Sequence, residues 1–281
     1  DWSQERFEYI KEKLTYFLLQ VGFRKQKVFF VPTSGFTGEN LLRRKNPALS
    51  SWYSGPTLIE QIDAFETPHR TLDKPFRMSI VDLFKGGIGA GGGSVSVSGR
   101  IEAGSVQIGD QLVVMPINEV GTVKALEIGE EPAKWAAAGD NILMSLAGLD
   151  ILHLSTGNIV CDVNKPITVT SYFRAQIVTF DIHIPLTIGV PVILHHQSLT
   201  EPATITKLTA ILNKNTGEII KKNPRALTKN VTATVEIKVK RPICIETFQD
   251  SKELGRFMLR AGSTTVAAGI GGFILLCWIV P

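Results

Sequence analysis

The glycine-rich stretch at residues 87–92, GIGAGG, is the pattern in the chain that most directly suggests a nucleotide site. Its spacing matches GxGxxG, in which backbone amides at a helix N-terminus hold the pyrophosphate of a dinucleotide. That fingerprint needs a strand before it and a helix after it. Residues 76–84 alternate as a strand does, but residues 94–98, SVSVS, alternate too and predict a second strand. We therefore predict a glycine-rich tip between two antiparallel strands; the alternative is an oxidoreductase that binds NAD or NADP.

Histidines are the next residues that could do chemistry, as metal ligands or general bases. His195 and His196 are adjacent, so on a strand they point to opposite faces and cannot chelate one ion together. His153 and His183 lie in apolar, strand-like segments. We predict structural roles for these four side chains, no metal site, and no Ser-His-Asp or paired-carboxylate centre.

Length and composition allow two or three domains with real cores, because the chain has 281 residues of which 44% are apolar. The net charge of +4 is too small to identify a class of partner. Three cysteines, Cys161, Cys244 and Cys277, are odd in number and lack the spacing of a zinc site. We expect unpaired thiols in a reducing compartment, buried as small core residues.

The elements that would position any site begin with an α/β segment at residues 1–66. Apolar residues recur at helical spacing from Phe7 to Val21 and predict a helix. The sequence KVFFVP at residues 27–32 predicts a short strand, followed by a turn-rich loop. A second helix is expected at residues 52–63, with Pro56 in its first turn.

The chain changes character after a proline-bearing linker at residues 67–75. From there, short alternating segments separated by turns predict antiparallel β-barrels at residues 76–166 and 167–270. The clearest strand is Val231–Val239, where every second residue from Val231 is apolar. Its other face is expected to be wet and carries Thr232, Thr234, Glu236 and Lys238.

An atypical apolar tail, GGFILLCWIVP, occupies residues 271–281. The uncharged run that contains it is shorter than the roughly 20 residues that a membrane-spanning helix needs. A buried strand with an irregular end is the preferred interpretation, and membrane association is not expected. A weak tail anchor is the alternative.

Several motifs occur in the order of one protein superfamily. VPTSGFTGENL is similar to a guanine-nucleotide motif, SGRIEAGSVQIGDQLVVMP to the hairpin of a second domain, and RPICIETFQDSKELGRFMLRAGSTTVAAGI to the closing strands of a third. The chain thus resembles the translational GTPases of the elongation factor Tu and elongation factor one-alpha superfamily. Within it, EPAKWAAAGDNI, LNKNTGEIIKKNPRALTKN and KELGRFMLR are most similar to the HBS-one-like GTPases, with eukaryotic release factor three as the close cousin.

The resemblance implies a mainly β fold: two antiparallel β-barrels, domains 2 and 3, preceded by an α/β remnant of a P-loop GTPase domain. It implies a parent protein that binds GTP and Mg²⁺ and acts in the cytoplasm. With Pelota, that parent would recognise stalled ribosomes, dissociate them and promote decay of the faulty mRNA. The alternative function is translation termination, as in release factor three. The small ribosomal subunit and its RNA backbone are expected partners; DNA is not.

The parts of a GTPase that do the chemistry are missing from these 281 residues. The chain has no Gly-Lys dipeptide and hence no phosphate-binding loop, no DxxG, and no NKxD, since NKNT at residues 213–216 lacks the aspartate. Stabilisation of phosphoryl transfer then has no source. We predict no catalytic residue and no cofactor for this chain alone. Ser34, Gly35 and Phe36 are the candidate guanine-loop residues, as the resemblance implies.

Positive charge gathers in residues 207–241, where nine Lys and Arg face only two Glu, a local excess of 9 − 2 = +7. Such a run suits phosphates or an acidic partner. It contains no aromatic residue, which argues against stacking on single-stranded RNA and favours contact with the RNA backbone. The candidate RNA or partner contacts across the chain are Lys85, Arg100, Lys221, Lys222, Arg225, Arg241 and Arg256.

Overall fold

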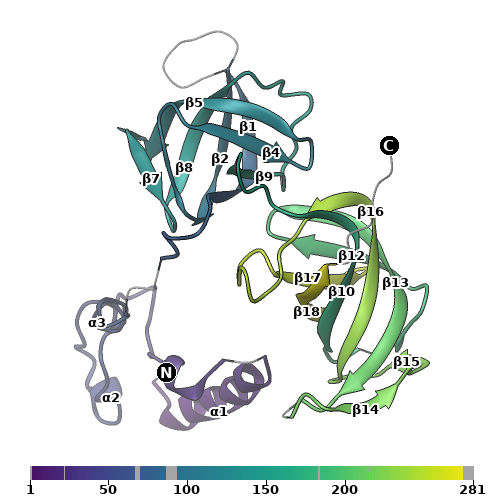
Figure 1. The fold of residues 1–281 in the computed structure, drawn as a ribbon. Helices are drawn as coiled ribbons and strands as arrows, with labels where there is room; N and C mark the ends of the chain where they lie inside the picture. The colour runs from purple at the N-terminus through teal and green to yellow at the C-terminus, as the bar shows by residue number, and fades with distance from the viewer. Residues whose placement is uncertain are drawn as a thin grey trace. The chain divides into compact units, whose positions relative to one another are not determined.

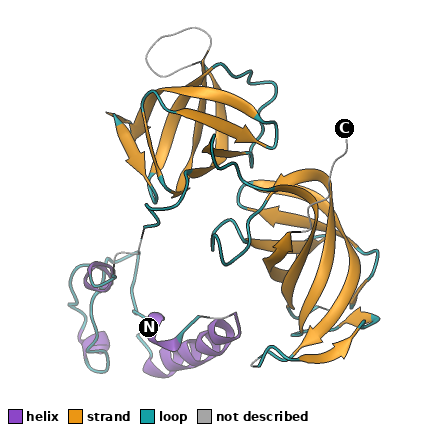
Figure 2. Ribbon diagram, in the orientation of Figure 1, coloured by secondary structure: helices purple, strands orange, loops and turns teal. Residues whose placement is uncertain are grey.

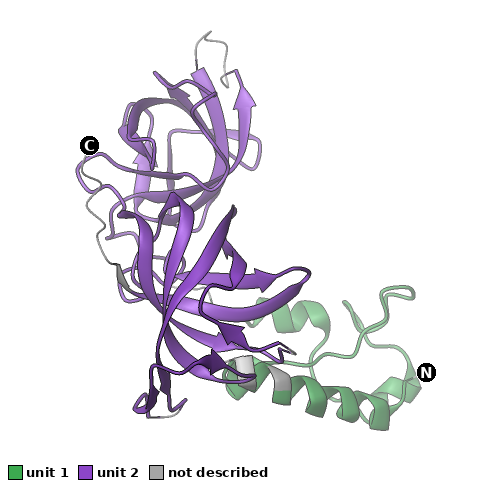
Figure 3. Cartoon of the chain, turned by 90° about the vertical axis from the view of Figure 1, so that its right-hand side faces the viewer, with its two compact units in different colours: residues 1–69 green, residues 70–281 purple. Residues whose placement is uncertain are grey.

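The computed structural model describes residues 2–21, 23–66, 70–86, 94–182, 184–214 and 216–274, with the side chains of residues 17, 20, 21, 273 and 274 left out. The glycine-rich stretch at residues 87–92, His183, Cys277 and most of the apolar tail therefore lie outside the described residues. Two compact units divide the chain, residues 1–69 and residues 70–281 (Figure 3). Helices occur in the first unit and strands in the second (Figure 2).

The first unit contains one helix of 18 residues, several shorter helical segments and a small aromatic cluster. Its helices are α1 (Gln4–Val21), the 3-10 turn η1 (Lys25–Lys27), α2 (Pro47–Ser50) and α3 (Leu58–Asp63) (Figure 1). Helix α1 confirms the helix that the apolar spacing from Phe7 to Val21 predicts. The Phe7 ring packs on Trp52 at 5.3 Å between centroids, and the Trp52 indole donates a hydrogen bond to the Trp2 carbonyl at 3.0 Å.

Two sequence expectations for this unit are wrong. Residues 27–32 form no strand. A strand needs a neighbour for its backbone groups, and no described segment of residues 2–66 pairs with these residues as a strand. The last helix begins after Pro56, not around it. Thr57 is its N-cap, and the side chains and amides of Thr57 and Glu60 form a reciprocal capping box.

The first barrel is a closed ring of six antiparallel strands in the order β4-β9-β1-β2-β8-β5, with β4 pairing back to β5. Its strands are β1 (Arg77–Lys85), β2 (Ser94–Ala103), β3 (Ser105–Gln107), β4 (Gln111–Met115), β5 (Glu119–Ile128), β6 (Glu131–Ala133), β7 (Trp135–Ala137), β8 (Asn141–Ala147) and β9 (Ile159–Asp162). Strands β1 and β2 pair from Arg77 opposite Ala103 to Lys85 opposite Val95. The strands predicted before and after the glycine-rich stretch are thus confirmed.

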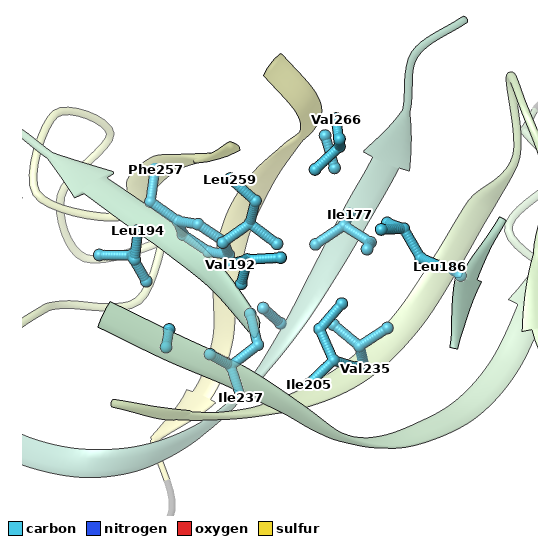
Figure 4. Close-up of a cluster of buried hydrophobic side chains, with 14 of the residues drawn as sticks. Ile177, Leu186, Val192, Leu194, Ile205, Val235, Ile237, Phe257, Leu259 and Val266 are labelled. Atoms are coloured by element: carbon cyan, nitrogen blue, oxygen red, sulfur yellow. The ribbon is translucent and has the colours of Figure 1, made fainter. Parts of the chain in front are cut away.

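The second barrel closes in the same way, in the order β12-β17-β18-β10-β16-β13, with β12 pairing back to β13. Its strands are β10 (Val169–Thr179), β11 (Leu186–Thr187), β12 (Pro191–His196), β13 (Leu199–Leu212), β14 (Ile219–Lys222), β15 (Ala226–Leu227), β16 (Thr232–Cys244), β17 (Arg256–Ala261) and β18 (Thr264–Ile274). Side chains from β10, β12, β13, β16 and β17 meet in its centre (Figure 4). The mainly β fold with two antiparallel barrels is confirmed.

Strand β16 follows the predicted alternation on its inner face only. Ala233, Val235 and Ile237 are fully buried in the barrel core. On the outer face, which we expected to be wet, Glu236 is only 6% exposed. That expectation is wrong for Glu236, because side chains from two neighbouring strands cover it, as described below. It is also wrong for Thr232, which is 6% exposed and lies between Val178 of β10 and Leu212 of β13.

No helix among the described residues combines the length and the apolar character that crossing a bilayer would require.

Candidate functional site

The predicted guanine loop is a hydrogen-bonded turn in the first unit. The Ser34 amide donates to the Glu39 carbonyl at 3.1 Å, and the Gly38 amide donates to the Ser34 carbonyl at 2.9 Å. A Cβ added at Gly35 would meet nothing within 4 Å, so no steric demand of the described fold explains this glycine. The Phe36 ring is fully exposed. The loop therefore presents backbone and an aromatic side chain outward.

Residues that follow the loop hold it in place. The Glu39 carboxylate accepts hydrogen bonds from the amides of Asn46 and Lys45, at 2.8 and 2.6 Å, and these bonds lower the pKa of Glu39. Asn40 is buried at φ 58°, and its side-chain amide donates to the Pro32 carbonyl at 2.8 Å. These contacts fix the shape of the loop.

A complete GTP and Mg²⁺ site does not fit the residues at hand. The loop could face a base, but the described residues contain no group of three or more His, Cys, Asp or Glu side chains suited to a metal ion. The sequence also has no phosphate-binding loop.

The described histidines have structural partners. His196 is buried, its Nε2 lies 2.9 Å from the Leu254 carbonyl oxygen, and burial lowers its pKa. His195 is half-buried on the opposite face, 3.2 Å from the Thr200 hydroxyl. The placement of these neighbours on opposite faces is confirmed. His153 lies in an exposed turn and not in the strand-like segment expected, and it contacts the Glu119 carboxylate at 2.5 Å.

The candidate basic contacts do not form a single patch. Lys221 and Lys222 lie on the exposed strand β14, and Arg225 follows them closely. Lys85 and Arg100 are exposed on the first barrel, but Lys85 pairs with Val95 at one end of the β1–β2 hairpin and Arg100 with Ser79 near the other. Only the β14 group brings several of these cations together.

Two further candidates are held by neighbours. The Arg241 guanidinium makes a bidentate pair with the Glu201 carboxylate, with Nη2 to Oε2 at 2.7 Å and Nε to Oε1 at 3.1 Å. The Glu201 side chain is 1% exposed and the Arg241 side chain 72% exposed. Arg256 lies over the Phe248 ring at 5.1 Å and 4.0 Å from Glu253.

A buried carboxylate on the outer wall of the second barrel escaped sequence reasoning. Glu236 accepts a very short hydrogen bond from the Tyr172 hydroxyl and one from Arg174 Nη2 at 3.1 Å, and Lys207 Nζ lies at 3.9 Å. The Tyr172 bond is the main reason that the pKa of Glu236 is lowered. The alternation of β16 could not reveal this cluster, because its partners come from β10 and β13.

The junction between the two barrels is a second feature that the sequence did not single out. Arg77 Nε contacts Glu246 Oε1 at 2.9 Å, with side chains 9% and 17% exposed. Beside them, Cys161 of the first barrel and Cys244 of the second share one buried apolar cluster with Leu254. The two barrels therefore meet through a buried apolar cluster and the Arg77–Glu246 ion pair.

Cys161 and Cys244 are free and buried, as predicted. Desolvation raises the pKa of the Cys161 thiol to about 11 and that of Cys244 further still. Since the thiolate is the reactive species, both should resist iodoacetamide near neutral pH in the folded protein and react after unfolding. A Cys277→Ser variant removes the third thiol from the assay.

Alkylation of either buried thiol at the rate of a free cysteine, under native conditions, would contradict this expectation. The sign of the pH effect follows from the same shift. Unfolded thiols ionise near pKa ~8.5, below the folded value, so their contribution to stability is complete below that pH and is lost as the pH rises toward the folded pKa.

Comparison with known proteins finds two matching family models and many related sequences. Residues 95–161 match the family model for elongation factor Tu domain 2, and residues 172–271 match the GTP-eEF1A C-terminal domain-like model. The chain is 46% identical over 270 residues to Protein HBS1 of Drosophila melanogaster, covering 96% of the chain and 40% of that protein. It is 34% identical to elongation factor 1-alpha of Hyperthermus butylicus, covering 96% of the chain and 60% of that protein.

A solved structure agrees with these sequence matches. The crystal structure of sup35 complexed with GDP aligns with a TM-score of 0.68 at 32% identity, covering 98% of the chain and 66% of that structure. The chain thus spans about 40% to 60% of the length of these two curated relatives.

Proposed function

The chain belongs to the elongation factor Tu and elongation factor 1-alpha superfamily of translational GTPases, and on that premise we propose that its barrels act in the rescue of stalled ribosomes together with Pelota. The observation that carries the proposal is the 46% identity to Protein HBS1 over 270 residues. In this proposal residues 76–166 and 167–270 are the two binding domains. A role at the ribosome implies a cytoplasmic location.

The resemblance implies a different partner for each barrel. The first barrel would meet the small ribosomal subunit, where Lys85 and Arg100 can contact RNA phosphates. The second would meet the carboxyl-terminal domain of Pelota, and Lys221, Lys222 and Arg225 supply charge for either partner. The buried junction between the barrels supports this role, since both surfaces then belong to one compact unit. Release of the ribosome and surveillance of the mRNA would follow from binding.

The role of GTP in this proposal rests only on membership of the superfamily. The residues at hand offer only the loop at Ser34, Gly35 and Phe36 to a guanine base, and we propose that they do not hydrolyse GTP by themselves. GTP and Mg²⁺ would serve the parent protein.

Termination is the second candidate function, because the motifs of the chain also resemble those of eukaryotic release factor three. In that case the partner would be a class-one release factor in place of Pelota. The two candidates differ in partner and not in fold, so a binding comparison separates them.

We expect the purified 281-residue chain to bind Pelota at least about tenfold more tightly than a class-one release factor, a difference of about 1.4 kcal/mol. Isothermal titration of both partners into the same preparation measures this ratio. As a control, Pelota is titrated into the chain in the presence of excess release factor. Its measured affinity should change little, because the release factor binds the chain more weakly. Equal affinities, or tighter binding of the release factor, would overturn the rescue assignment and favour termination.

A further inference from the structure

A groove of about 570 Å³ crosses the outer wall of the second barrel, and none of the functions above uses it. It runs over strands β17, β12, β13 and β16, which are neighbours in the sheet. The side chains that define it are Pro191, Ile193, Pro202, Thr204, Lys238, Lys240 and Arg260.

Strand register arranges four of these side chains in a row across the groove. Arg260 pairs with Ile193, and Ile193 pairs with Pro202. Because Ala203 pairs with Val239, the antiparallel register puts Pro202 opposite Lys240. We call Arg260, Ile193, Pro202 and Lys240 the cross-strand row. It has an apolar centre and a cation at each end, three strand spacings or about 14 Å apart.

The row faces solvent and not the core. Successive residues of a strand point to opposite faces. The neighbours of the row along each strand, including Val192, Ala203 and Leu259, are buried inside the barrel. Ile193 is 38% exposed, an unusual amount for an isoleucine in the middle of a sheet. The short Pro202 beside long basic side chains explains why the surface is hollow here.

The cations of the groove lack acidic partners. No described carboxylate forms an ion pair with Lys238, Lys240 or Arg260. The neighbouring carboxylate, Glu201, is already neutralised by its bidentate pair with Arg241. Arg260 Nη2 donates to the Ser263 carbonyl at 2.8 Å, which restrains the guanidinium at its end of the row.

We propose that this groove binds an extended acidic segment of a partner protein, with an apolar side chain over Ile193 and Pro202 and a carboxylate at each end of the cross-strand row. An extended peptide rises about 3.3 Å per residue, so side chains four positions apart lie about 13 Å apart on one face. That distance matches the separation of Arg260 and Lys240. The groove therefore selects the pattern acidic-x-apolar-x-acidic.

Charge and shape favour this occupant over two others. A second copy of the chain would bring three like charges against three, which repels. RNA phosphates would find cations only at the rim and would cover the apolar centre without filling it. The inference goes beyond the proposed function, because the groove is defined by its own side chains and needs neither Pelota nor the ribosome.

The test is fluorescence anisotropy of the full chain with a fluorescein-labelled peptide of sequence Gly-Glu-Ala-Leu-Ala-Glu-Gly. We expect saturable binding that weakens at least about tenfold in a Lys240→Glu, Arg260→Gln double variant. A Lys221→Glu, Lys222→Glu variant is the matched control, since it removes more charge from the exposed strand β14 and should bind the peptide as the parent chain does. Lys240→Glu alone, at an exposed position, guards against misfolding of the double variant.

Three outcomes would overturn the proposal. One is an equal loss of binding in the β14 control, which would mean attraction to net charge only. Another is equal binding of Gly-Glu-Leu-Glu-Ala-Ala-Gly, which has the same composition and the wrong spacing. The third is tighter binding of short single-stranded oligouridine that depends on Lys240, which would assign the groove to RNA. Each result leaves the Pelota titration untouched, so the two proposals fail separately.

Discussion

Replacing Phe173 by alanine is expected to lower the free energy of unfolding by about 3 to 5 kcal/mol, the range for removing a buried phenylalanine. Phe173 lies on β10 with no exposed surface and packs edge-on against Phe257, with ring centroids 5.5 Å apart. The Phe257 ring is itself pressed against the Gly269 backbone, because a Cβ on Gly269 would lie 2.3 Å from the ring. The glycine leaves no flexible side chain at that point to fill the cavity.

Urea unfolding followed by near-ultraviolet circular dichroism measures this loss. Phe84→Ala is the matched control, because Phe84 is 49% exposed on β1 and the same atoms are removed. We expect the control to change stability by no more than about 0.5 kcal/mol. A Phe173→Ala loss as small as the control's would mean that the second barrel does not have the core described here.

The barrels could be predicted from the sequence because period-two alternation is a local signal. The strands on both sides of the glycine-rich stretch show it clearly, as does the inner face of β16. The same logic failed at residues 27–32, where the apolar composition suits a strand but no described segment of the first unit pairs with it as a strand. A strand is a property of a pair, and the sequence pattern describes only one member.

The candidate surfaces were harder to predict, because their chemistry depends on distant partners. The run of cations at residues 207–241 was visible in the sequence, but the sequence did not show which of these cations are paired with a carboxylate. Arg241 is bound to Glu201, which lies 40 residues away, whereas Lys240 next to it forms no ion pair with a described carboxylate. Register across β12, β13, β16 and β17, and not composition, made the groove apparent.

The junction between the barrels gives the second large expected effect. Arg77→Ala should cost about 3 kcal/mol, because it leaves the Glu246 carboxylate nearly buried without its partner. Arg77 also donates to the Phe76 carbonyl at 3.0 Å, so its loss leaves that carbonyl with the Asp162 amide at 3.4 Å as a donor. At about 2 to 4 °C per kcal/mol, the thermal midpoint should fall by roughly 6 to 12 °C.

A charge-free junction separates the cost of an orphaned carboxylate from the worth of the ion pair itself. Arg77→Met combined with Glu246→Leu should recover stability to within about 1 kcal/mol of the parent chain, because the surrounding cluster of Val113, Ile159 and Leu254 is apolar. Glu253→Ala, which breaks an ion pair exposed by more than half, should cost no more than about 0.5 kcal/mol. If the double variant is as unstable as Arg77→Ala, the ion pair itself stabilises the junction; if Arg77→Ala is as mild as Glu253→Ala, the barrels do not share the buried contact from which their common binding role is argued.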